Sequence, residues 1–320
     1  GSHMEQFDFD VVIVGGGPAG CTCALYTARS ELKTVILDKN PAAGALAITH
    51  KIANYPGVPG EMSGDHLLEV MRDQAVEFGT VYRRAQVYGL DLSEPVKKVY
   101  TPEGIFTGRA LVLATGAMGR IASIPGEAEY LGRGVSYCAT CDGAFYRNRE
   151  VVVVGLNPEA VEEAQVLTKF ASTVHWITPK DPHTLDGHAD ELLAHPSVKL
   201  WEKTRLIRIK GEEAGVTAVE VRHPGESDSQ ELLAEGVFVY LQGSKPITDF
   251  VAGQVEMKPD GGVWVDEMMQ TSVPGVWGIG DIRNTPFKQA VVAAGDGCIA
   301  AMAIDRFLNS RKAIKPDWAH

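Results

Sequence analysis

Two cysteines near the middle of the chain have the spacing of a redox pair. The stretch CATCDG (138–143) places the thiols of Cys138 and Cys141 three positions apart. At this spacing two thiols can close a disulfide and exchange it with another dithiol. The adjacent carboxyl group of Asp142 can carry the proton that the exchange requires. A zinc site would need two more ligands, and the sequence has no second Cys-x-x-Cys or histidine pair to supply them. A pair of inert thiols is the remaining alternative.

A glycine-rich turn near the amino terminus predicts a dinucleotide site. Residues 15–20 (GGGPAG) follow an apolar strand, Asp10–Val14, and precede a helix that runs to about Arg29. Glycines at this spacing permit a tight turn, close approach of a pyrophosphate, and close packing of the helix on the strand. The phosphates then lie at the amino terminus of the helix. Asp38, at the end of the next strand, is the acidic residue expected to bind the ribose hydroxyls. A simple glycine-rich turn is the alternative.

A second strand–turn–helix pattern follows the two cysteines. It consists of Val151–Val154, Gly155–Ala160 and a helix through about Phe170. An apolar strand comes next, Val174–Ile177, as Thr34–Leu37 does after the first pattern. Two βαβ units predict two parallel-sheet nucleotide-binding folds.

The remaining strong patterns predict how the chain is divided. Ala110–Gly116 and Gly275–Asp281 are apolar strands that end in glycine turns, and a helix is expected from about Gln289 to Leu308. The predicted fold class is α/β, with two Rossmann-like three-layer domains, the second inserted into the first. The first domain is expected to comprise residues 5–118 plus 246–320, and the inserted domain residues 119–245.

Composition narrows the class of protein. Residues 1–4 (GSHM) are predicted to be an expression tag without fold information. The net charge of −11 argues against a general nucleic-acid-binding protein. No apolar run reaches the roughly 18 residues that would suggest a membrane span. Five cysteines in 320 residues do not make a disulfide framework, so a reducing, cytoplasmic location is expected. Cys21 and Cys23 are expected to pack their helix on the sheet.

The sequence resembles the low-molecular-weight thioredoxin reductase family, which consists of FAD-dependent disulfide oxidoreductases. The resemblance covers nearly the whole length, and CATCDG in its context is its most specific part. The matching stretches are GGGPAG (15–20), ANYPG (53–57), ATGA (114–117), GRGVSYCATCDGAFYRN (132–148), TSVPGVWGIGD (271–281) and KQAVVAAGDGCIAA (288–301).

The resemblance implies a role for each catalytic residue. Cys141 would face the flavin, Cys138 would attack the partner's disulfide, and Asp142 would be the general acid. Ala45 departs from the family, which commonly has Gln at this position in the flavin site. The residues implied as FAD contacts are Gly15, Gly17, Pro18, Ala19, Gly20, Asp38, Lys39, Gly44, Leu46, Asn54, Val87, Ala114, Thr115, Gly116, Gly280, Asp281, Lys288, Gln289 and Ala290.

The family's NADPH site is degraded in this sequence. Asn157 replaces the glycine that lets the pyrophosphate approach the backbone, and Glu159 adds negative charge nearby. The family's His-Arg-Arg-x-x-x-Arg, which neutralises the 2′-phosphate, aligns with residues 178–184 (TPKDPHT), where Lys180 is the only basic survivor. The pattern resembles the pyridine-nucleotide-independent branch of the family, whose members take electrons from ferredoxin or another carrier, or bind a second flavin. Ordinary drift in a working NADPH site is the alternative.

The predicted function is transfer of electrons from FAD to the Cys138–Cys141 disulfide and on to a thioredoxin-like protein. The expected donor is ferredoxin or a second flavin, NADPH is not expected, and a homodimer follows from the resemblance. A conventional NADPH-dependent thioredoxin reductase and a non-enzymatic flavin redox sensor are the alternative functions. Trp318 near the carboxy terminus could stack on the isoalloxazine ring of a partner subunit, or be an ordinary tail residue.

Overall fold

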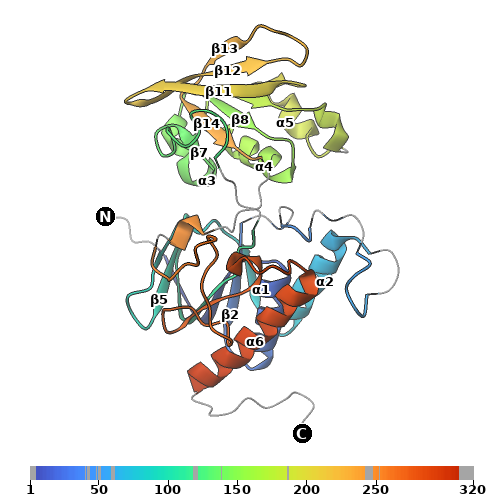
Figure 1. Cartoon of the computed structure of the whole chain (residues 1–320), viewed down its shortest axis with the longest axis vertical. Coiled ribbons are helices and arrows are strands. Elements are labelled where there is room, and N and C mark those ends of the chain that lie inside the picture. Colours follow the sequence, from blue (N-terminus) through green and yellow to red (C-terminus); the bar gives the residue numbers. More distant parts are fainter. Residues whose placement is uncertain are drawn as a thin grey trace. The chain divides into compact units, whose positions relative to one another are not determined.

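The structure is a computed structural model of the chain, and it divides into two compact units (Figure 1). The units comprise residues 1–119 with 244–320, and residues 120–243. The described residues are 5–39, 41, 44–47, 49, 52–58, 62–117, 122–137, 139–185, 187–241, 248–251 and 253–309, without the side chains of 140, 141 and 249. The predicted tag, Cys138 and Trp318 therefore lie outside the described residues.

The first unit is built on a seven-stranded sheet in the order β3-β2-β1-β6-β5-β4, with β15 also paired to β6. Strands β3, β2, β1, β6 and β15 are parallel, whereas β5 pairs antiparallel with β6 and β4 pairs antiparallel with β5. The strands are β1 (Gln6–Val14), β2 (Thr34–Asp38), β3 (Val81–Arg84), β4 (Gly89–Asp91), β5 (Lys97–Thr101), β6 (Gly104–Leu113) and β15 (Val276–Gly278).

The two faces of this sheet belong to separate cores because neighbouring residues of a strand point to opposite sides. Val11 and Ile13 of β1 lie in the core that also contains buried residues of three helices, whereas Val12 and Val14 lie in the core of the other face. The helices are α1 (Pro18–Arg29), α2 (Gly64–Glu77) and α6 (Ala290–Asn309). The short 3-10 helices of this unit are η3 (Asp249–Val251) and η4 (Gly280–Arg283).

The second unit contains a five-stranded parallel sheet in the order β10-β9-β8-β14-β7. Its strands are β7 (Val135–Ser136), β8 (Glu150–Val154), β9 (Thr173–Ile177), β10 (Val198–Trp201) and β14 (Gly236–Val239). One face packs against an antiparallel sheet of β11 (Arg205–Glu212), β12 (Gly215–Arg222) and β13 (Gln230–Leu233). The other face packs against helices, chiefly α4 (Pro158–Leu167). The remaining helices are α3 (Ala139–Asp142), α5 (Asp190–Ala194), η1 (Gly143–Tyr146) and η2 (Pro182–Leu185).

The predicted fold class, two Rossmann-like α/β folds, is confirmed. Helix α4, which the sequence predicts to run through about Phe170, ends at Leu167. The antiparallel strands β4, β5 and β11–β13 are an addition that the sequence patterns did not predict. Among the described residues, no helix is long and apolar enough to cross a membrane.

Candidate functional site

The predicted FAD contacts of the first unit converge at the carboxyl ends of its parallel strands. Val14 is opposite Leu113, and Leu113 is opposite Gly278, so β1, β6 and β15 end side by side. The backbone N–H of Ala114 donates to the carbonyl of Val14 at 2.8 Å. The segments after these strands, which begin at Gly15, Ala114 and Ile279, therefore meet at one edge, where such sheets bind their ligands.

The glycine-rich turn of the first unit has the geometry that a pyrophosphate needs. Gly15 has φ +114°, and a Cβ there would lie 2.1 Å from the carbonyl oxygen of Ala114. A Cβ on Gly20 would lie 2.1 Å from the carbonyl oxygen of Gly15, which explains the close approach of helix and strand. At Gly17 a Cβ would meet no described atom within 4 Å. This open space lies directly before Pro18, at the amino terminus of α1, so the turn fits a bound phosphate group.

Asp38 lies against the same turn, as the sequence predicts. Its side chain accepts hydrogen bonds from the hydroxyl of Tyr82 at 2.5 Å and from the backbone N–H of Gly16. Burial raises the pKa of Asp38, and the positive charges of Arg72 and Arg84 partly oppose that shift. The carboxyl group is therefore held at the edge of the turn by groups from three different segments.

Residues far apart in sequence complete this edge. The side-chain amide of Asn54 donates to Oε1 of Gln289 at 3.1 Å, across 235 positions. Gln289 directly precedes α6, and α6 lies close against α1 because Gly297 leaves room for the backbone of Ala19. Burial raises the pKa of Asp281, which lies between the end of β15 and the start of α6.

Asp296 is a residue of this edge that sequence reasoning missed. Its Oδ2 accepts from the backbone N–H of Gly280 at 2.9 Å and from Arg283 at 2.7 Å. The carboxylate is 5% exposed, so these bonds compensate for its burial. An acidic residue on the apolar helix 290–309 was the signal that could have identified it. Asp296 thus holds the turn that begins at Gly280 against α6.

The other predicted FAD contacts differ in exposure. Leu46 and Val87 have side chains buried in the two cores, so only their backbone groups can face a ligand. Lys288 is exposed and donates to Oδ1 of Asn284 at 2.9 Å. Ala19 and Ala114 are buried, Pro18, Lys39, Thr115, Gly116 and Ala290 are partly buried, and Gly44 is exposed.

Residues 139–142 of the redox motif form the short helix α3 of the second unit. The backbone of Cys141 belongs to this helix, but its side chain and the whole of Cys138 are outside the described residues. Oδ2 of Asp142 accepts a hydrogen bond from the hydroxyl of Ser136 at 2.6 Å. At the other end of α3, the backbone N–H of Ala139 donates to the hydroxyl of Tyr240 at 3.1 Å.

Two of the remaining cysteines are buried in the first unit. Cys21 and Cys23 are both fully buried on α1, and burial raises the pKa of the Cys21 thiol to about 12. Both therefore pack α1 in the core, as expected. Among the described residues, no three His, Cys, Asp or Glu side chains form a group that could hold a metal ion.

In the glycine-rich turn of the second unit, the side chain of Asn157 forms two hydrogen bonds within the protein. Gly155 has φ +138°, so the tight turn persists. Oδ1 of Asn157 accepts the backbone N–H of Ala160 at 2.8 Å, and its Nδ2 donates to the carbonyl of Tyr240 at 2.6 Å. Pro158 has no N–H to offer. Because α1 also begins with a proline, Pro18, the donor that distinguishes α4 is the N–H of Ala160, which Asn157 occupies.

The segment aligned with the family's 2′-phosphate anchors makes hydrogen bonds within itself. Thr178 is fully buried, and its hydroxyl donates to the carbonyl of Lys180 at 2.7 Å. Asp181 accepts from the backbone N–H of His183 at 3.0 Å, and its Oδ1 lies 2.7 Å from that residue's Nδ1. A carboxylate therefore occupies the centre of the segment in which the family has basic residues.

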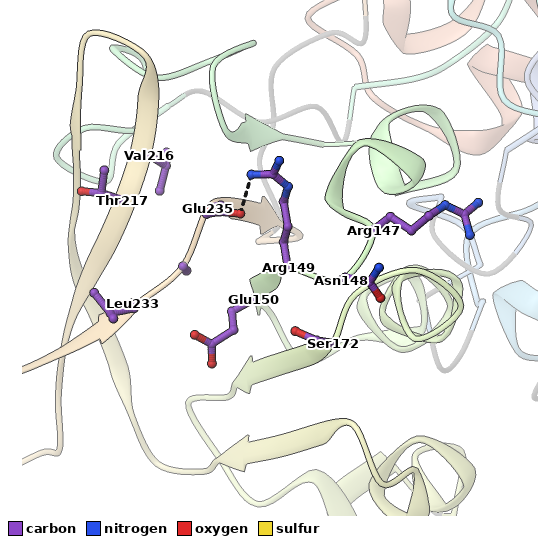
Figure 2. A pocket seen from close by; sticks show the side chains of 10 residues that line it. Arg147, Asn148, Arg149, Glu150, Ser172, Val216, Thr217, Leu233 and Glu235 are labelled. Carbon is purple, nitrogen blue, oxygen red and sulfur yellow. Dashed lines mark hydrogen bonds and ion pairs between the residues drawn. The ribbon is translucent and has the colours of Figure 1, made fainter.

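A cavity of about 650 Å³ opens elsewhere on this unit (Figure 2). It lies at the amino-terminal ends of β8 and β14, beside Glu150 and Glu235, whereas the Gly155 turn follows the carboxyl end of β8. Arg149 forms an ion pair with Glu235 at 2.9 Å, and the side chain of Arg147 points away from this pair (Figure 2). The cavity is therefore separate from the edge where nucleotides bind in such sheets.

Residues 9–297 match the family described as pyridine nucleotide-disulphide oxidoreductase. The chain belongs to this family. It is 44% identical to a thioredoxin reductase from Aquifex aeolicus, over 99% of each chain. Among solved structures, a thioredoxin reductase from Gloeobacter violaceus is 99% identical, with a TM-score of 0.95 and 98% of each chain covered. A ferredoxin-flavin thioredoxin reductase from Clostridium acetobutylicum is 27% identical, with a TM-score of 0.72 and coverage of 96% of this chain and 100% of the other.

These similarities confirm the low-molecular-weight thioredoxin reductase family and the FAD-dependent disulfide oxidoreductase class. FAD is thus the cofactor of the family to which the chain belongs. The open turn at Gly17 and the carboxyl group of Asp38 fit its pyrophosphate and ribose.

Proposed function

We propose that the protein passes two electrons from FAD to the Cys138–Cys141 disulfide and then to a thioredoxin-like protein, without using NADPH. FAD would be held by the domain of residues 5–118 and 246–320, and the redox pair by residues 119–245. The observation that carries the NADPH part is the double hydrogen bond of Asn157, which closes the second glycine-rich turn.

The first reason for excluding NADPH is the loss of a phosphate-binding donor. A helix amino terminus binds phosphate through free backbone N–H groups. In α4 the N–H of Ala160 is bonded to Asn157, whereas no side chain caps the corresponding end of α1. Glu159 in the same first turn adds a negative charge that would repel a phosphate. A pyrophosphate would have to displace a protein hydrogen bond and tolerate that repulsion.

The second reason is the loss of cations for the 2′-phosphate. Each lost charge-assisted contact typically removes roughly 1.5–3 kcal/mol of binding free energy. The three missing anchors would together lower NADPH affinity by several orders of magnitude. Asp181, bonded within its own segment to His183, worsens the local charge further.

Cys138, Cys141 and Asp142 would carry out the thiol–disulfide exchange. Bound FAD supplies a two-electron carrier, and reduction of the disulfide breaks its S–S bond and leaves two thiols. Asp142 takes the proton of the Cys138 thiol, the resulting thiolate attacks the partner's disulfide to form a mixed disulfide, and Asp142 returns the proton to the partner thiolate that leaves. The Cys141 thiolate next attacks Cys138, which restores the intramolecular disulfide and releases the partner as a dithiol.

The proposed donor is ferredoxin or a second flavin. The similarity to a ferredoxin-flavin thioredoxin reductase supports ferredoxin. The two arginines that follow the redox motif, Arg147 and Arg149, both contact other side chains of this chain, which weakens the argument that their charges bind ferredoxin. Arg149 is paired with Glu235, and the guanidinium of Arg147 lies 5.2 Å from the ring centre of Phe170. A ferredoxin that docks here would be held chiefly by Arg147. The homodimer and the cytoplasmic location remain predictions from the family.

The test is anaerobic reduction of the FAD-loaded protein by two donors in parallel. We expect photoreduced ferredoxin to bleach the flavin, at a rate that falls as salt screens the surface charges. We expect micromolar NADPH to leave the flavin oxidised over the same period. Rapid stoichiometric bleaching by NADPH would instead establish the conventional NADPH-dependent enzyme.

A second experiment tests the exchange itself. A Cys141→Ser variant should hold thioredoxin as a mixed disulfide through Cys138, because the resolving thiol is missing. The matched control is a Cys138→Ser variant, which should trap nothing. Absence of an adduct in both variants would favour a flavin redox sensor over an enzyme.

A further inference from the structure

The helix that carries the redox motif is too short to hold its own position. Helix α3 comprises only the four residues Ala139–Asp142. Formation of a first helical turn is unfavourable in isolation. A helix of this length therefore depends on contacts with residues outside it. In this structure each of its two terminal residues is bonded to a hydroxyl group of a neighbouring strand region.

The first hydroxyl belongs to Tyr240, which directly follows β14. It accepts the backbone N–H of Ala139, and both residues are buried. The backbone of Tyr240 is itself bonded on both sides: its N–H donates to the carbonyl of Val154 at 2.8 Å, and its carbonyl accepts from Asn157. These two backbone bonds hold Tyr240 in place, with its hydroxyl against the first residue of α3.

The second hydroxyl belongs to Ser136 on β7. It donates to Oδ2 of Asp142 at 2.6 Å, and Ser136 is 5% exposed. In the sheet, Ser136 is opposite Phe238 of β14, only two positions before Tyr240. The two hydroxyl groups thus come from adjacent parallel strands and bond to opposite ends of the same helix.

We propose that Ser136 and Tyr240 are positioning residues for thiol–disulfide exchange. Tyr240 fixes the start of α3, next to Cys138 in the chain, and Ser136 orients the carboxyl group that protonates the leaving thiolate. The proposal rests on the proposed roles of the two cysteines and Asp142. The other titratable groups around this helix are Tyr146 on η1, whose pKa is raised chiefly by burial and further by Asp142, and Glu159 and Glu163 on α4, whose charges act on Tyr240.

The two roles predict different responses to the leaving group. The FAD-loaded protein is reduced with dithionite, freed of excess reductant, and mixed with oxidised glutathione or with the aromatic disulfide DTNB. An alkyl thiolate leaves slowly unless it is protonated, whereas the aromatic thiolate of DTNB leaves without a proton. Ser136→Ala should therefore slow exchange with oxidised glutathione about tenfold and with DTNB less than about twofold. Tyr240→Phe should slow both substrates, because it displaces the helix itself.

Two control variants separate positioning from general loss of stability. Ser136→Thr keeps a hydroxyl on a strand residue and should restore the rate with oxidised glutathione. Tyr137→Phe removes a hydroxyl whose bond goes to Glu127 at 2.7 Å, and should leave the ratio of the two rates unchanged. All variants are compared at equal FAD content, and thermal melting reports any loss of folding.

The outcomes discriminate the two proposals. Equal slowing of both substrates by Ser136→Ala, or no slowing at all, would overturn the role of Ser136. Wild-type rates for Tyr240→Phe with both substrates would overturn the role of Tyr240. If Cys138→Ser exchanges with both substrates as fast as the parent, the proposed function itself fails, because Cys138 is then not the attacking thiol.

Discussion

The glycine-rich turns of the two units have the same topology but differ at one position, which is open in the first turn and filled by a side chain in the second. In both, a parallel strand leads through a glycine with positive φ into a helix whose first residue is proline. Before α1, Gly17 leaves open space and contributes no side chain. Before α4, Asn157 fills the same position and bonds both the helix and Tyr240. The two Rossmann-like units thus share a fold, while one side chain occupies in the second turn the space that is open in the first.

The physical reason is that a helix amino terminus needs partners for its free N–H groups. A nucleotide phosphate can supply them, and so can an N-cap side chain, which is worth roughly 1 kcal/mol. The first unit leaves this role to a ligand. In the second unit the side chain of Asn157 supplies such a partner for the N–H of Ala160.

The largest expected effect is loss of FAD from a Gly17→Val variant. Gly17 has φ −80°, which valine adopts without strain, and no described atom would contact the new Cβ. The side chain should intrude only on the pyrophosphate, so the purified protein should be colourless yet folded. The measurement is the ratio of flavin to protein absorbance, together with circular dichroism. A Gly17→Val protein that keeps its full FAD would refute the placement of the pyrophosphate.

The second effect is a gain in NADPH affinity when Asn157 is replaced by glycine and arginines are introduced at the positions of the family's 2′-phosphate anchors. Pro179 and Thr184 are exposed and align with arginines of the family's 2′-phosphate site, so both can become Arg without damage to the core. Asn157→Gly with Pro179→Arg and Thr184→Arg should bind NADPH about 10²–10⁴-fold more tightly than the parent. Titration of nucleotide fluorescence measures this affinity. Asn157→Gly alone is the control, and an equal gain from it would mean that charge is unimportant here.

A smaller effect concerns the stability of the second unit. Asn157→Ala removes the cap of α4 and the bond to Tyr240, and should lower the free energy of unfolding by about 1–2 kcal/mol. Asn157→Ser keeps an oxygen that can cap the helix and should recover part of this loss. Urea unfolding monitored by circular dichroism gives both values. Equal stability of the Ala variant and the parent would show that the side chain does not replace a ligand energetically.

The smallest effect is a pH dependence due to Asp38 in the FAD-free protein. The pKa of Asp38 is raised in the folded state, chiefly by burial, so the folded protein binds the proton more tightly than the unfolded one. The carboxyl group therefore lowers stability above its folded pKa, and this penalty disappears as the pH falls through it. We expect Asp38→Asn to be more stable than the parent at pH 7, with a difference that shrinks in acid. A difference independent of pH would contradict the inferred direction of the shift.

The sequence by itself determined the two Rossmann-like folds and the first glycine-rich turn. These features are local: the glycines of 15–20, the apolar strands beside them and Asp38 lie within one βαβ unit. Their spacing specifies backbone geometry directly, because only glycine fits the tight turn and the close helix contact. The closure of the second turn was partly visible as well, since Asn157 stands where glycine is needed.

Only the tertiary structure decided which distant side chains meet. The bond between Asn54 and Gln289 spans 235 positions, and Asp296 reaches Gly280 from a different element. The bonds of Asn157 and Ala139 to Tyr240 likewise depend on β14 being the neighbour of both β8 and β7 in the sheet. Hydrophobic periodicity tells which residues are buried, but not which polar groups become neighbours. That choice depends on strand order and on the close packing of the whole unit.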